Sequence, residues 1–529
     1  MTADLIHRRR WWTLAVLSIS LLVVSLDNTI LNVALPSVAR DLDASSSELQ
    51  WVVDSYMLVF AGLLLTAGSL GDRFGRRRAL TTGLLVFAGG SVLAALSGST
   101  TELIASRALM GVGGALIMPS TLSILTAVFP ADERAKAIGA WAAVAGLGIA
   151  LGPIAGGWLV DHADWHWVFL VNVPIAVLAL AAGRVLVPES RDPKPDRVDL
   201  PGAALSTLGL TALLWAVIEA PDRGWTDGPI LGAFAAAAVV LGLFVAWELR
   251  TPTPMLDVRL FRNARFSAAS GAIGLAFFGL FGTLFFTTQY LQSVHGFSPL
   301  EAGVWSLPIA AGLAMGGPLS ARIGARVGAK FLVSGGLAIV AGGLALYATA
   351  GPKSGFALIG GAEAILGLGI GLAMTPATDS IMGTLPPERA SVGSALNDAV
   401  RQVGGALGVA VLGSVLSSHY RDGMDGATNG LTGPAGHAAH DSVAGASAVA
   451  DRIGGAAGQA LHHTANLAFV EGMQIAMLVA AAVTAVGALI ALVLLPSRGA
   501  AGEAIGETAA QPAVAPVRTI EPVAVPSPA

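Results

Sequence analysis

The sequence contains no cysteine, and only 12% of its 529 residues are charged. The absence of cysteine excludes disulfides, thiolate metal sites and cysteine nucleophiles. The scarcity of charge excludes an ordinary soluble globular protein, in which about a quarter of the residues are charged. Hydrophobic residues instead make up 54% of the chain, and its 66 glycines suit closely packed membrane helices. The composition therefore predicts a polytopic membrane protein.

Several motifs of enzymes and ligand-binding proteins are also missing. There is no GxxxxGK[ST] loop for nucleotide phosphates, so the sequence does not indicate an ATP-driven pump. There is no HExxH motif, and the histidines show no recurring spacing typical of metal ligands. We therefore expect no enzymatic activity, no cofactor and no metal site. Nothing in the composition supports nucleic-acid binding.

Fourteen apolar runs are each long enough to cross a bilayer as a helix, which takes about 20 residues. They lie at residues 12–37, 49–70, 79–97, 101–128, 137–160, 168–187, 200–218, 229–248, 266–290, 299–321, 331–349, 356–383, 390–417 and 467–495.

Positive charges are distributed unevenly around these runs. With the N-terminus in the cytoplasm, the outer segments hold few of the 30 Lys and Arg residues. Those few are Arg40, Arg223, Lys353, Arg421 and Arg452. Since membrane proteins keep most Lys and Arg of short loops on the cytoplasmic side, we predict a multi-pass protein of the cell inner (plasma) membrane with both termini in the cytoplasm.

The second half of the chain repeats patterns of the first. GDRFGRR (71–77) matches GARVGAK (324–330), and GALIMPSTLSIL (114–125) matches GLAMTPATDSIM (371–382). The offset is about 255 residues, which indicates a duplication of six helices. Parallel repeats with a binding site at their midplane interface are typical of secondary transporters.

Two copies of six helices account for twelve of the fourteen expected helices, and the remaining two lie between the copies. We predict an all-α integral membrane fold in which two six-helix bundles are separated by two inserted helices. The expected parts are a first bundle at 1–190, the inserted helices with flanking linkers at 191–262, a second bundle at 263–498 and a disordered cytoplasmic tail at 499–529. The second bundle includes a long outer loop at 418–466, with a short amphipathic helix expected around 442–462.

The stretch GSLGDRFGRRRAL (68–80) joins the second and third expected helices on the cytoplasmic side. Its glycines permit a tight turn, and we expect Asp72 near a helix start beside a cluster of arginines. The residues concerned are Gly68, Gly71, Asp72, Arg73, Gly75, Arg76 and Arg77. Two interpretations stand: a turn whose charges only fix the topology, or an additional charge latch that gates transport.

The fifth expected helix carries small residues on one face. Three glycines recur every four residues, and a proline interrupts the helical hydrogen bonds. The residues of this pattern are Gly139, Gly148, Gly152, Pro153, Gly156 and Gly157. Such a face lets another helix approach closely, which is either ordinary packing or part of a transport mechanism.

Both stretches resemble signatures of the major facilitator superfamily. The turn at 68–80 resembles the loop between its second and third helices, although the second half has Ala325 in the place of Asp72. The glycine pattern resembles the motif that marks the antiporters of the superfamily rather than its symporters. Five further stretches resemble the fourteen-helix drug:proton antiporters of the EmrB/QacA type: LDNTILNVALP (26–36), WVVDSYML (51–58), LIASRALMGVGGA (103–115), WHWVFLVNVP (165–174) and PMLDVRLF (254–261).

The likeness covers nearly the whole chain. It implies multidrug efflux by proton antiport, with small-molecule drugs and protons as partners. Quaternary ammonium biocides and cationic dyes are the substrates that it suggests. We expect the protein to work as a monomer in the lipid bilayer.

Asp27 is the most unusual residue of the first apolar run. A carboxylate costs about 2.5–3.5 kcal/mol near the bilayer centre on insertion scales, so an intramembrane acid is a functional candidate. Trp11 to Asp27 covers about 24 Å of helix, and Asp54 and Arg107 reach a similar depth. We therefore predict that Asp27, Asp54 and Arg107 couple protons to substrate, because a carboxylate that binds either a proton or a cation can exchange them. The alternative is that Asp27 pairs with Arg107 only to fix the packing.

The second half offers further polar candidates. Glu363 lies about 12 Å from the outer end of its helix and has no cation nearby on that helix, so it is a second coupling candidate. Asp398 and Arg401, three residues apart, either line a cavity or neutralise each other. The remaining candidates for lining a cavity are Tyr56, Phe281, Phe285 and Gln289. Phe277, Phe281, Phe285 and Gln289 recur every four residues along one expected helix, and this aromatic stripe either holds lipophilic cations through π faces or faces lipid.

The sequence thus predicts a multidrug exporter that releases lipophilic, cationic drugs by alternating access in exchange for protons. Three alternatives stay open. They are a dedicated exporter of one endogenous or neutral antibiotic, a proton-coupled solute importer, and a membrane-embedded sensor or assembly subunit that uses the outer loop for partners. The glycine face argues against import, and duplicated bundles around buried acids argue against a sensor.

Overall fold

The computed structural model describes residues 3–42, 44, 46–190, 199–252, 254–385, 390–428, 431 and 433–495. The regular structure of these residues is helical throughout, and fourteen helical segments among them are long and apolar enough to cross a membrane. The predicted fold class and the predicted number of spans are confirmed. The tail predicted at 499–529 lies outside the described residues.

The helices follow one another in two groups of membrane spans, with an inserted pair between them. The first group comprises α1 (Ala3–Asp41), α2 (Ser46–Phe74), α3 (Arg76–Ala95), α4 (Thr100–Val128), α5 (Ala131–His162), α6 (His166–Leu170) and α7 (Asn172–Leu186). The inserted pair is α8 (Leu200–Arg223) and α9 (Gly228–Arg250). The second group comprises α10 (Ala264–Gln289), α11 (Pro299–Trp305), α12 (Leu307–Val327), α13 (Ala329–Tyr347), α14 (Phe356–Met382), α15 (Ala390–Met424) and α18 (Gly455–Leu494). A 3₁₀ turn, η1 (Val258–Arg262), precedes α10, and a π turn, η2 (Tyr290–Val294), follows it.

Two expected helices are each divided in the structure. The run at 168–187 forms α6 and α7, which separate at Val171. The run at 299–321 forms α11 and α12, which separate at Ser306. Pro308 favours the second break, because a proline has no backbone N–H to continue the hydrogen bonds of the preceding turn, whereas this loss costs nothing in the first turn of a new helix.

Capping side chains fix several helix starts. The Ser99 hydroxyl accepts a hydrogen bond from the Glu102 N–H (3.3 Å) where α4 begins. Ser298 and Glu301 form a reciprocal capping box at the start of α11, and Asn263 caps α10. These oxygens satisfy N–H groups that have no acceptor within the helix, which is why the helices begin at these residues.

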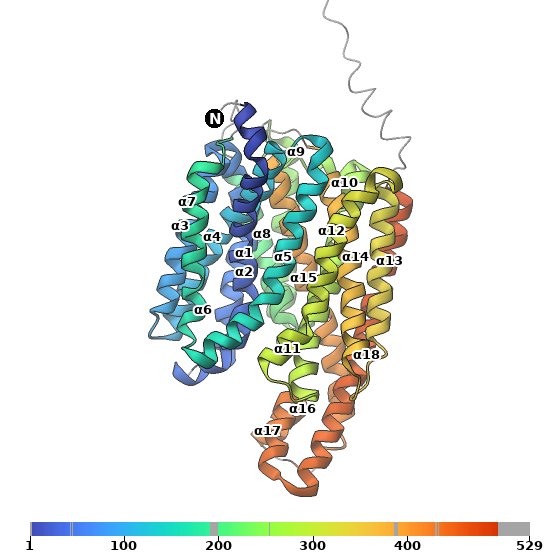
Figure 1. The fold of residues 1–529 in the computed structure, drawn as a ribbon. Coiled ribbons are helices and arrows are strands. Elements are labelled where there is room, and N and C mark those ends of the chain that lie inside the picture. Colours follow the sequence, from blue (N-terminus) through green and yellow to red (C-terminus); the bar gives the residue numbers. More distant parts are fainter. Residues whose placement is uncertain are drawn as a thin grey trace, which may run out of the picture. The chain divides into compact units, whose positions relative to one another are not determined.

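The ribbon has two distinct ends (Figure 1). α1 begins and α18 ends at one end, which we call the N-face. The opposite end, from which α16 (Pro434–Asp441) and α17 (Val443–Ile453) project, is the far face. The Arg-rich turn between α2 and α3 belongs to the N-face, because α1 runs away from it and α2 returns to it.

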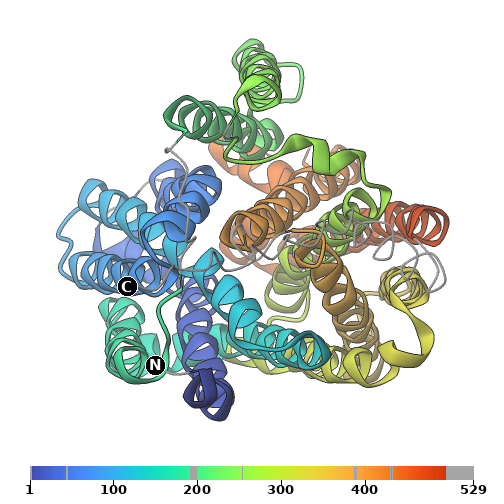
Figure 2. The same cartoon turned by 90° about the horizontal axis from the view of Figure 1, so that it is seen from above.

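The two groups of helices meet along two seams. Within the first group α1 packs on α5, and α2 packs on α4; within the second, α12 packs on α14, and α10 on α15. Between the groups, α5 packs on α12 along one seam, and α2 and α4 pack on α15 along the other. Seen along the helices, the blue and cyan helices of the first group lie beside the yellow to red helices of the second (Figure 2).

The inserted pair lies to one side of the bundle, next to the seam between α2 and α15 (Figure 2). α8 packs on both of these helices. The hydroxyls of Thr66 on α2 and Thr207 on α8 lie 3.2 Å apart, and the Trp225 indole donates to the Ser414 hydroxyl on α15 (2.7 Å). α8 therefore joins both groups of helices along this seam.

Among the residues that the structure describes, the outer loop predicted at 418–466 is largely helical. α15 continues to Met424 and α18 begins at Gly455, so both spans extend beyond the expected membrane limits and carry α16 and α17 between them. The helix expected around 442–462 ends at Ile453, because Gly454 has a φ of 63°. This left-handed conformation ends a helix and favours glycine.

Candidate ion-coupling and gating sites

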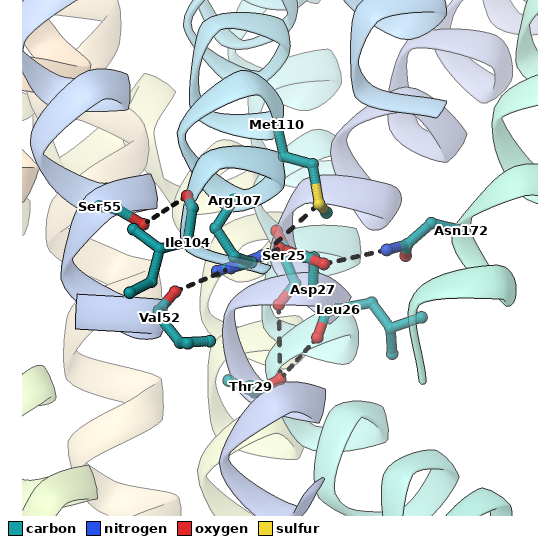
Figure 3. A network of polar contacts seen from close by, with 10 residues as sticks. All are labelled: Ser25, Leu26, Asp27, Thr29, Val52, Ser55, Ile104, Arg107, Met110 and Asn172. Carbon is teal, nitrogen blue, oxygen red and sulfur yellow. Dashed lines mark hydrogen bonds and ion pairs between the residues drawn. The ribbon is translucent and has the colours of Figure 1, made fainter. Parts of the chain in front are cut away.

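Asp27 lies at the centre of a buried network in the first group of helices. Its side chain has no exposed surface, and its Oδ2 is 2.5 Å from Nη1 of Arg107 on α4. Its other oxygen, Oδ1, accepts a hydrogen bond from Nδ2 of Asn172 at the start of α7 (2.9 Å). Figure 3 shows the three side chains converging from three helices. The sequence arithmetic that placed Asp27 and Arg107 at one depth is consistent with this contact.

The Arg107 guanidinium has further partners that hold it in place. Its Nε donates to the backbone oxygen of Val52 on α2 (3.1 Å), and the Met110 sulfur lies 3.9 Å from Nη1 (Figure 3). The guanidinium carbon lies 4.5 Å from the centre of the Tyr56 ring, a cation–π distance. Such partners offset part of the large cost of removing a charge pair from water, and removal of one partner of a buried pair typically costs about 3–5 kcal/mol.

Tyr56, a candidate for lining a cavity, lies beside this network, and its role in lining a cavity stays a prediction. Its side chain is fully buried, and its ring stacks on Phe60 with ring centres 5.7 Å apart. A Cβ added to Gly114 on α4 would lie 2.9 Å from the Tyr56 hydroxyl, so α4 covers the ring closely. Tyr56 is therefore part of the core that supports Arg107.

Asp54 is half-buried one turn from the network, on the same helix as Val52. Asp27 contacts Arg107 and Asn172, and Arg107 also contacts Val52 and Met110. Its predicted part in coupling stays a prediction.

Glu363 lies on α14, in the second group of helices, with no exposed surface. Within the described part of the chain, neither of its carboxylate oxygens has a hydrogen-bond partner. The nearby Tyr347 on α13 interacts with it electrostatically and shares a hydrogen bond with Thr287 on α10 (2.9 Å between oxygens). Asp27 and Glu363 are thus buried carboxylates in different surroundings: Asp27 is paired with a cation, and Glu363 has no hydrogen bond within the described residues.

Asp72 lies on the N-face, and the structure corrects its expected position. It was predicted near a helix start, but it occupies the end of α2, which continues to Phe74. Its Oδ1 accepts hydrogen bonds from Nε (2.9 Å) and Nη2 (2.8 Å) of Arg76. Its Oδ2 accepts one from the backbone N–H of Val392 (3.2 Å), in the first turn of α15. The carboxylate therefore does lie at a helix start, that of a helix in the other group.

The turn itself consists of Gly75 alone, with a φ of 113°. Only glycine adopts this conformation readily, and an added Cβ would lie 2.6 Å from a carboxylate oxygen of Glu189. Glu189 also lies 3.7 Å from the Arg77 guanidinium, and Ser190 accepts a hydrogen bond from the Arg76 N–H (2.9 Å). The segment after α7 is thus bound to the positively charged turn.

Replacing Asp72 by asparagine is expected to loosen the N-face. The change removes the charge that pairs with Arg76 and that favours the N-terminus of α15, an effect worth up to about 2 kcal/mol in partly buried sites. Because the chain lacks cysteine, spin labels at F74C on α2 and V327C on α12 report the distance between the two groups of helices. We expect a longer and broader distance distribution in D72N, and an unchanged one in the exposed control Asp132→Asn. An unchanged distribution in D72N would exclude Asp72 as a link between them.

The glycines of α5 face two neighbours. Added Cβ atoms at Gly148 and Gly156 would lie 2.7 Å from Cβ of Ser25 and 2.9 Å from the Ile30 oxygen, both on α1. On the opposite face, a Cβ at Gly139 would lie 2.9 Å from the Gly317 oxygen on α12. α5 therefore packs closely on α1 and on the other group of helices at the same time.

The remaining members of the α5 pattern differ in how much room they have. A Cβ at Gly152 would overlap with the Thr29 hydroxyl on α1, whereas one at Gly157 would be 3.5 Å from Leu300, an ordinary contact. The Pro153 ring lies 2.9 Å from a Cβ added at Gly303 on α11. Close packing therefore explains Gly152 but not Gly157.

The aromatic stripe of α10 faces α15 in part. The Phe281 ring packs on Gly405, where an added Cβ would lie 2.5 Å from the ring, but Phe285 is 43% exposed. The Gln289 amide donates to the Phe285 backbone oxygen (3.4 Å). Their role in lining a cavity stays a prediction.

Asp398 and Arg401 do pair on one face of α15, with Oδ1 and Nη1 3.4 Å apart. The guanidinium carbon of Arg401 also lies 5.3 Å from the ring centres of Trp141 and Phe277. Sequence reasoning did not single out Asn172 or Trp141. Asn172 interrupts an otherwise apolar run and could have been found by that signal, whereas Trp141 looks like any other membrane tryptophan.

The comparisons with known proteins account for this arrangement of duplicated helices, glycine faces and Arg-rich turn. A family model described as the Major Facilitator Superfamily matches residues 17–409. The chain belongs to the major facilitator superfamily. The resemblance found from the motifs is therefore confirmed. The relatives of the chain include multidrug and antibiotic efflux pumps, which is consistent, together with its fourteen candidate spans, with the fourteen-helix type of the superfamily.

Three relatives illustrate the similarity. The chain is 37% identical over 491 residues to the tetracenomycin C resistance and export protein of Streptomyces glaucescens, with 92% of this chain and 91% of the relative covered. It is 40% identical over 485 residues to the multidrug efflux pump LfrA of Mycolicibacterium smegmatis, with 90% and 96% covered. It is 38% identical over 412 residues to the puromycin resistance protein pur8 of Streptomyces alboniger, with 77% and 82% covered.

The fold is similar to the crystal structure of the human organic anion transporter MFSD10. The TM-score is 0.60, and the match covers 92% of this chain and 99% of that chain. At 14% sequence identity this likeness concerns the fold alone.

Proposed function

We propose that this protein exports lipophilic drugs, cationic ones among them, by proton antiport. It works as a monomer in the inner (plasma) membrane with the N-face in the cytoplasm, as the uneven distribution of Lys and Arg suggests. The names of the relatives support drug export, since LfrA is called a multidrug efflux pump and two others are named for resistance to tetracenomycin C and puromycin. Residues 1–190 and 263–498 are the two halves that move against each other.

The observation that carries the proposal is the burial of the Asp27 carboxylate between two donors, Arg107 and Asn172. A proton that reaches Asp27 from the outer side neutralises the carboxylate and weakens its attraction to Arg107, because an ion pair depends on both charges. The guanidinium is then free to change partners, so the arrival of a proton is linked to a movement of α4 relative to α1. Release of the proton to the cytoplasm restores the pair.

Glu363 provides the place where drug and proton compete. A buried carboxylate without hydrogen bonds is costly, and either a proton or a cationic ligand removes that cost. A cationic drug taken up from the cytoplasm binds the ionised form, and a proton from the outer side displaces it. The contact of Asp72 with α15 closes the N-face while this exchange takes place.

Transport in membrane vesicles tests the direction and the energy source. Inside-out vesicles with this protein and an acidic interior are expected to accumulate ethidium, and a protonophore that collapses the gradient is expected to abolish the accumulation. Accumulation that persists after collapse of the gradient would contradict proton coupling. Concentrative, proton-dependent uptake into right-side-out vesicles would instead establish an importer. Transport of one compound from a broad panel would favour a dedicated exporter.

Replacing Glu363 by glutamine is expected to slow ethidium transport about tenfold or more and to flatten its pH dependence. Glutamine keeps the size of the side chain but cannot carry the charge that attracts a cation or the proton that displaces it. The measurement is the initial rate of ethidium uptake into inside-out vesicles over a range of pH. Glu471→Gln, at an exposed position on α18, is the matched control and should behave like the unmodified protein. Unchanged rates and pH dependence in Glu363→Gln would exclude Glu363 from coupling.

A further inference from the structure

A second buried polar cluster lies between the two groups of helices. Arg401 extends from α15 of the second group, and its guanidinium carbon lies 5.3 Å from the ring centre of Trp141 on α5 of the first. It lies equally far from the ring of Phe277 on α10. The cation is thus held between an aromatic ring from each group, at their interface.

The face of α15 that carries Arg401 is polar and buried. Ser394, Asn397, Asp398 and Arg401 occupy positions i, i+3, i+4 and i+7, which share one side of a helix. None of the four is more than 5% exposed. An apolar face would pack at lower cost here, so four polar residues in this row indicate a ligand-binding surface rather than simple packing.

Several hydrogen-bonding groups of the cluster lack partners within the described residues. The donors among them are Nε and Nη2 of Arg401, Nε1 of Trp141 and Nδ2 of Asn397. Arg401 uses Nη1 for Asp398, so the two nitrogens that remain form one edge of the guanidinium. This edge is the fork that binds both oxygens of a carboxylate through two parallel hydrogen bonds. Buried donors are normally satisfied, so this edge calls for an acceptor.

The depth of the cluster suits a transported ligand. Trp141 lies about 15 Å along α5 from Ala131, and Arg401 lies about 16 Å along α15 from Ala390, both measured from the N-face. In a hydrocarbon core of about 30 Å, these positions fall near the midplane. Substrate sites of transporters built from two repeats lie at this depth, at the interface of the repeats.

We propose that this cluster binds the acidic oxygen of an aromatic substrate, a carboxylate or a phenolate. The Arg401 fork, assisted by Trp141 and Asn397, holds the oxygen atoms, while the rings of Trp141 and Phe277 contact the aromatic body. The proposal rests on the proposed export function and specifies its substrate class: the protein accepts zwitterionic and acidic aromatic drugs and not only lipophilic cations. Asp398 pairs with Arg401 when the site is empty.

A matched pair of dyes tests this site. Rhodamine B carries a free carboxylate, and rhodamine B ethyl ester has the same ring system without it. Binding of each dye to the purified full chain is measured by fluorescence anisotropy, and the readout is the ratio of the two affinities. Arg401→Lys keeps the charge but loses the fork, and Trp141→Phe keeps a ring but loses the donor. We expect the unmodified protein to prefer rhodamine B, and Arg401→Lys to reduce this preference about tenfold, which corresponds to about 1.4 kcal/mol.

Arg421→Lys, at an exposed position of α15, should leave the ratio unchanged, and Trp141→Phe should reduce it. A ratio that is the same in Arg401→Lys and the unmodified protein, or equal losses for both dyes, would overturn the proposal and make the cluster a packing element. Export of the two dyes by inside-out vesicles separates the two proposals. Specific binding of rhodamine B without export of either dye would refute the export function alone, whereas export of the ester without binding of the acid would refute the site alone.

Discussion

Asp27→Asn is expected to abolish drug export, although the protein reaches the membrane at nearly normal abundance. Asparagine keeps the shape of the side chain and an acceptor oxygen for Asn172, but it cannot take up and release a proton near neutral pH. Cells that produce the variant should be as sensitive to ethidium as cells without the protein. The measurements are growth inhibition by ethidium and the amount of protein in the membrane fraction.

A double variant separates coupling from folding. Asp27→Asn leaves the buried guanidinium of Arg107 without its counter-charge, and such a loss typically costs about 3–5 kcal/mol. Asp27→Asn with Arg107→Gln removes both charges, so it should regain stability against thermal unfolding but not export. Asp422→Asn, at an exposed position of α15, is the matched control and should keep both. Recovery of export in the double variant would mean that Asp27 and Arg107 only fix the packing.

Gly152→Val is expected to eliminate export and to lower the unfolding temperature of the protein. A Cβ at Gly152 would overlap with the Thr29 hydroxyl, and it would lie 2.8 Å from Thr29 Cβ and 3.0 Å from the Ile30 nitrogen. Because both residues belong to α1, the two helices would have to separate, and Asp27 would move away from Arg107. Overpacking of this kind typically costs about 1–3 kcal/mol, and the coupling geometry would be lost in addition.

Gly89→Val provides the matched control for this substitution. Gly89 lies on α3, and a Cβ added to it meets nothing within 4 Å. The same change in side-chain size should therefore leave export and unfolding temperature close to those of the unmodified protein. Export at the normal rate by Gly152→Val would contradict the close approach of α1 and α5.

The membrane fold followed from the sequence because a bilayer restricts the choice of structure. Apolar runs of about 20 residues have to be helices, and the duplicated motifs identified which helices correspond. The depth of Asp27 and Arg107 could be compared from the rise per residue, since both helices were expected to cross the membrane. Helix breaks were harder to predict, because Ser306 lies in an apolar run that continues past the break, and Gly454 lies within the short helix expected around 442–462.

The contacts of the site residues depended on distant segments and were largely beyond sequence reasoning. Asp72 reaches the backbone of Val392, 320 positions away, and no local pattern links the two. Asn172 reaches Asp27 over 145 positions in the same way. Tyr56 is of a residue type that can line a cavity, and only the packing of α4 against α2 shows that its ring contacts the Arg107 guanidinium. Residue types indicated which side chains carry chemistry, and the packing of helices decided which of them meet.

The most direct test of the proposed mechanism measures protons and drug together. Inside-out vesicles that contain the protein are given an acidic interior, the internal pH is followed with a fluorescent dye that is quenched by the gradient, and ethidium is then added. Proton antiport through Asp27 predicts that fluorescence recovers when ethidium is added to vesicles with the unmodified protein and does not recover with Asp27→Asn. Equal recovery with Asp27→Asn, or ethidium accumulation without any recovery, would contradict it.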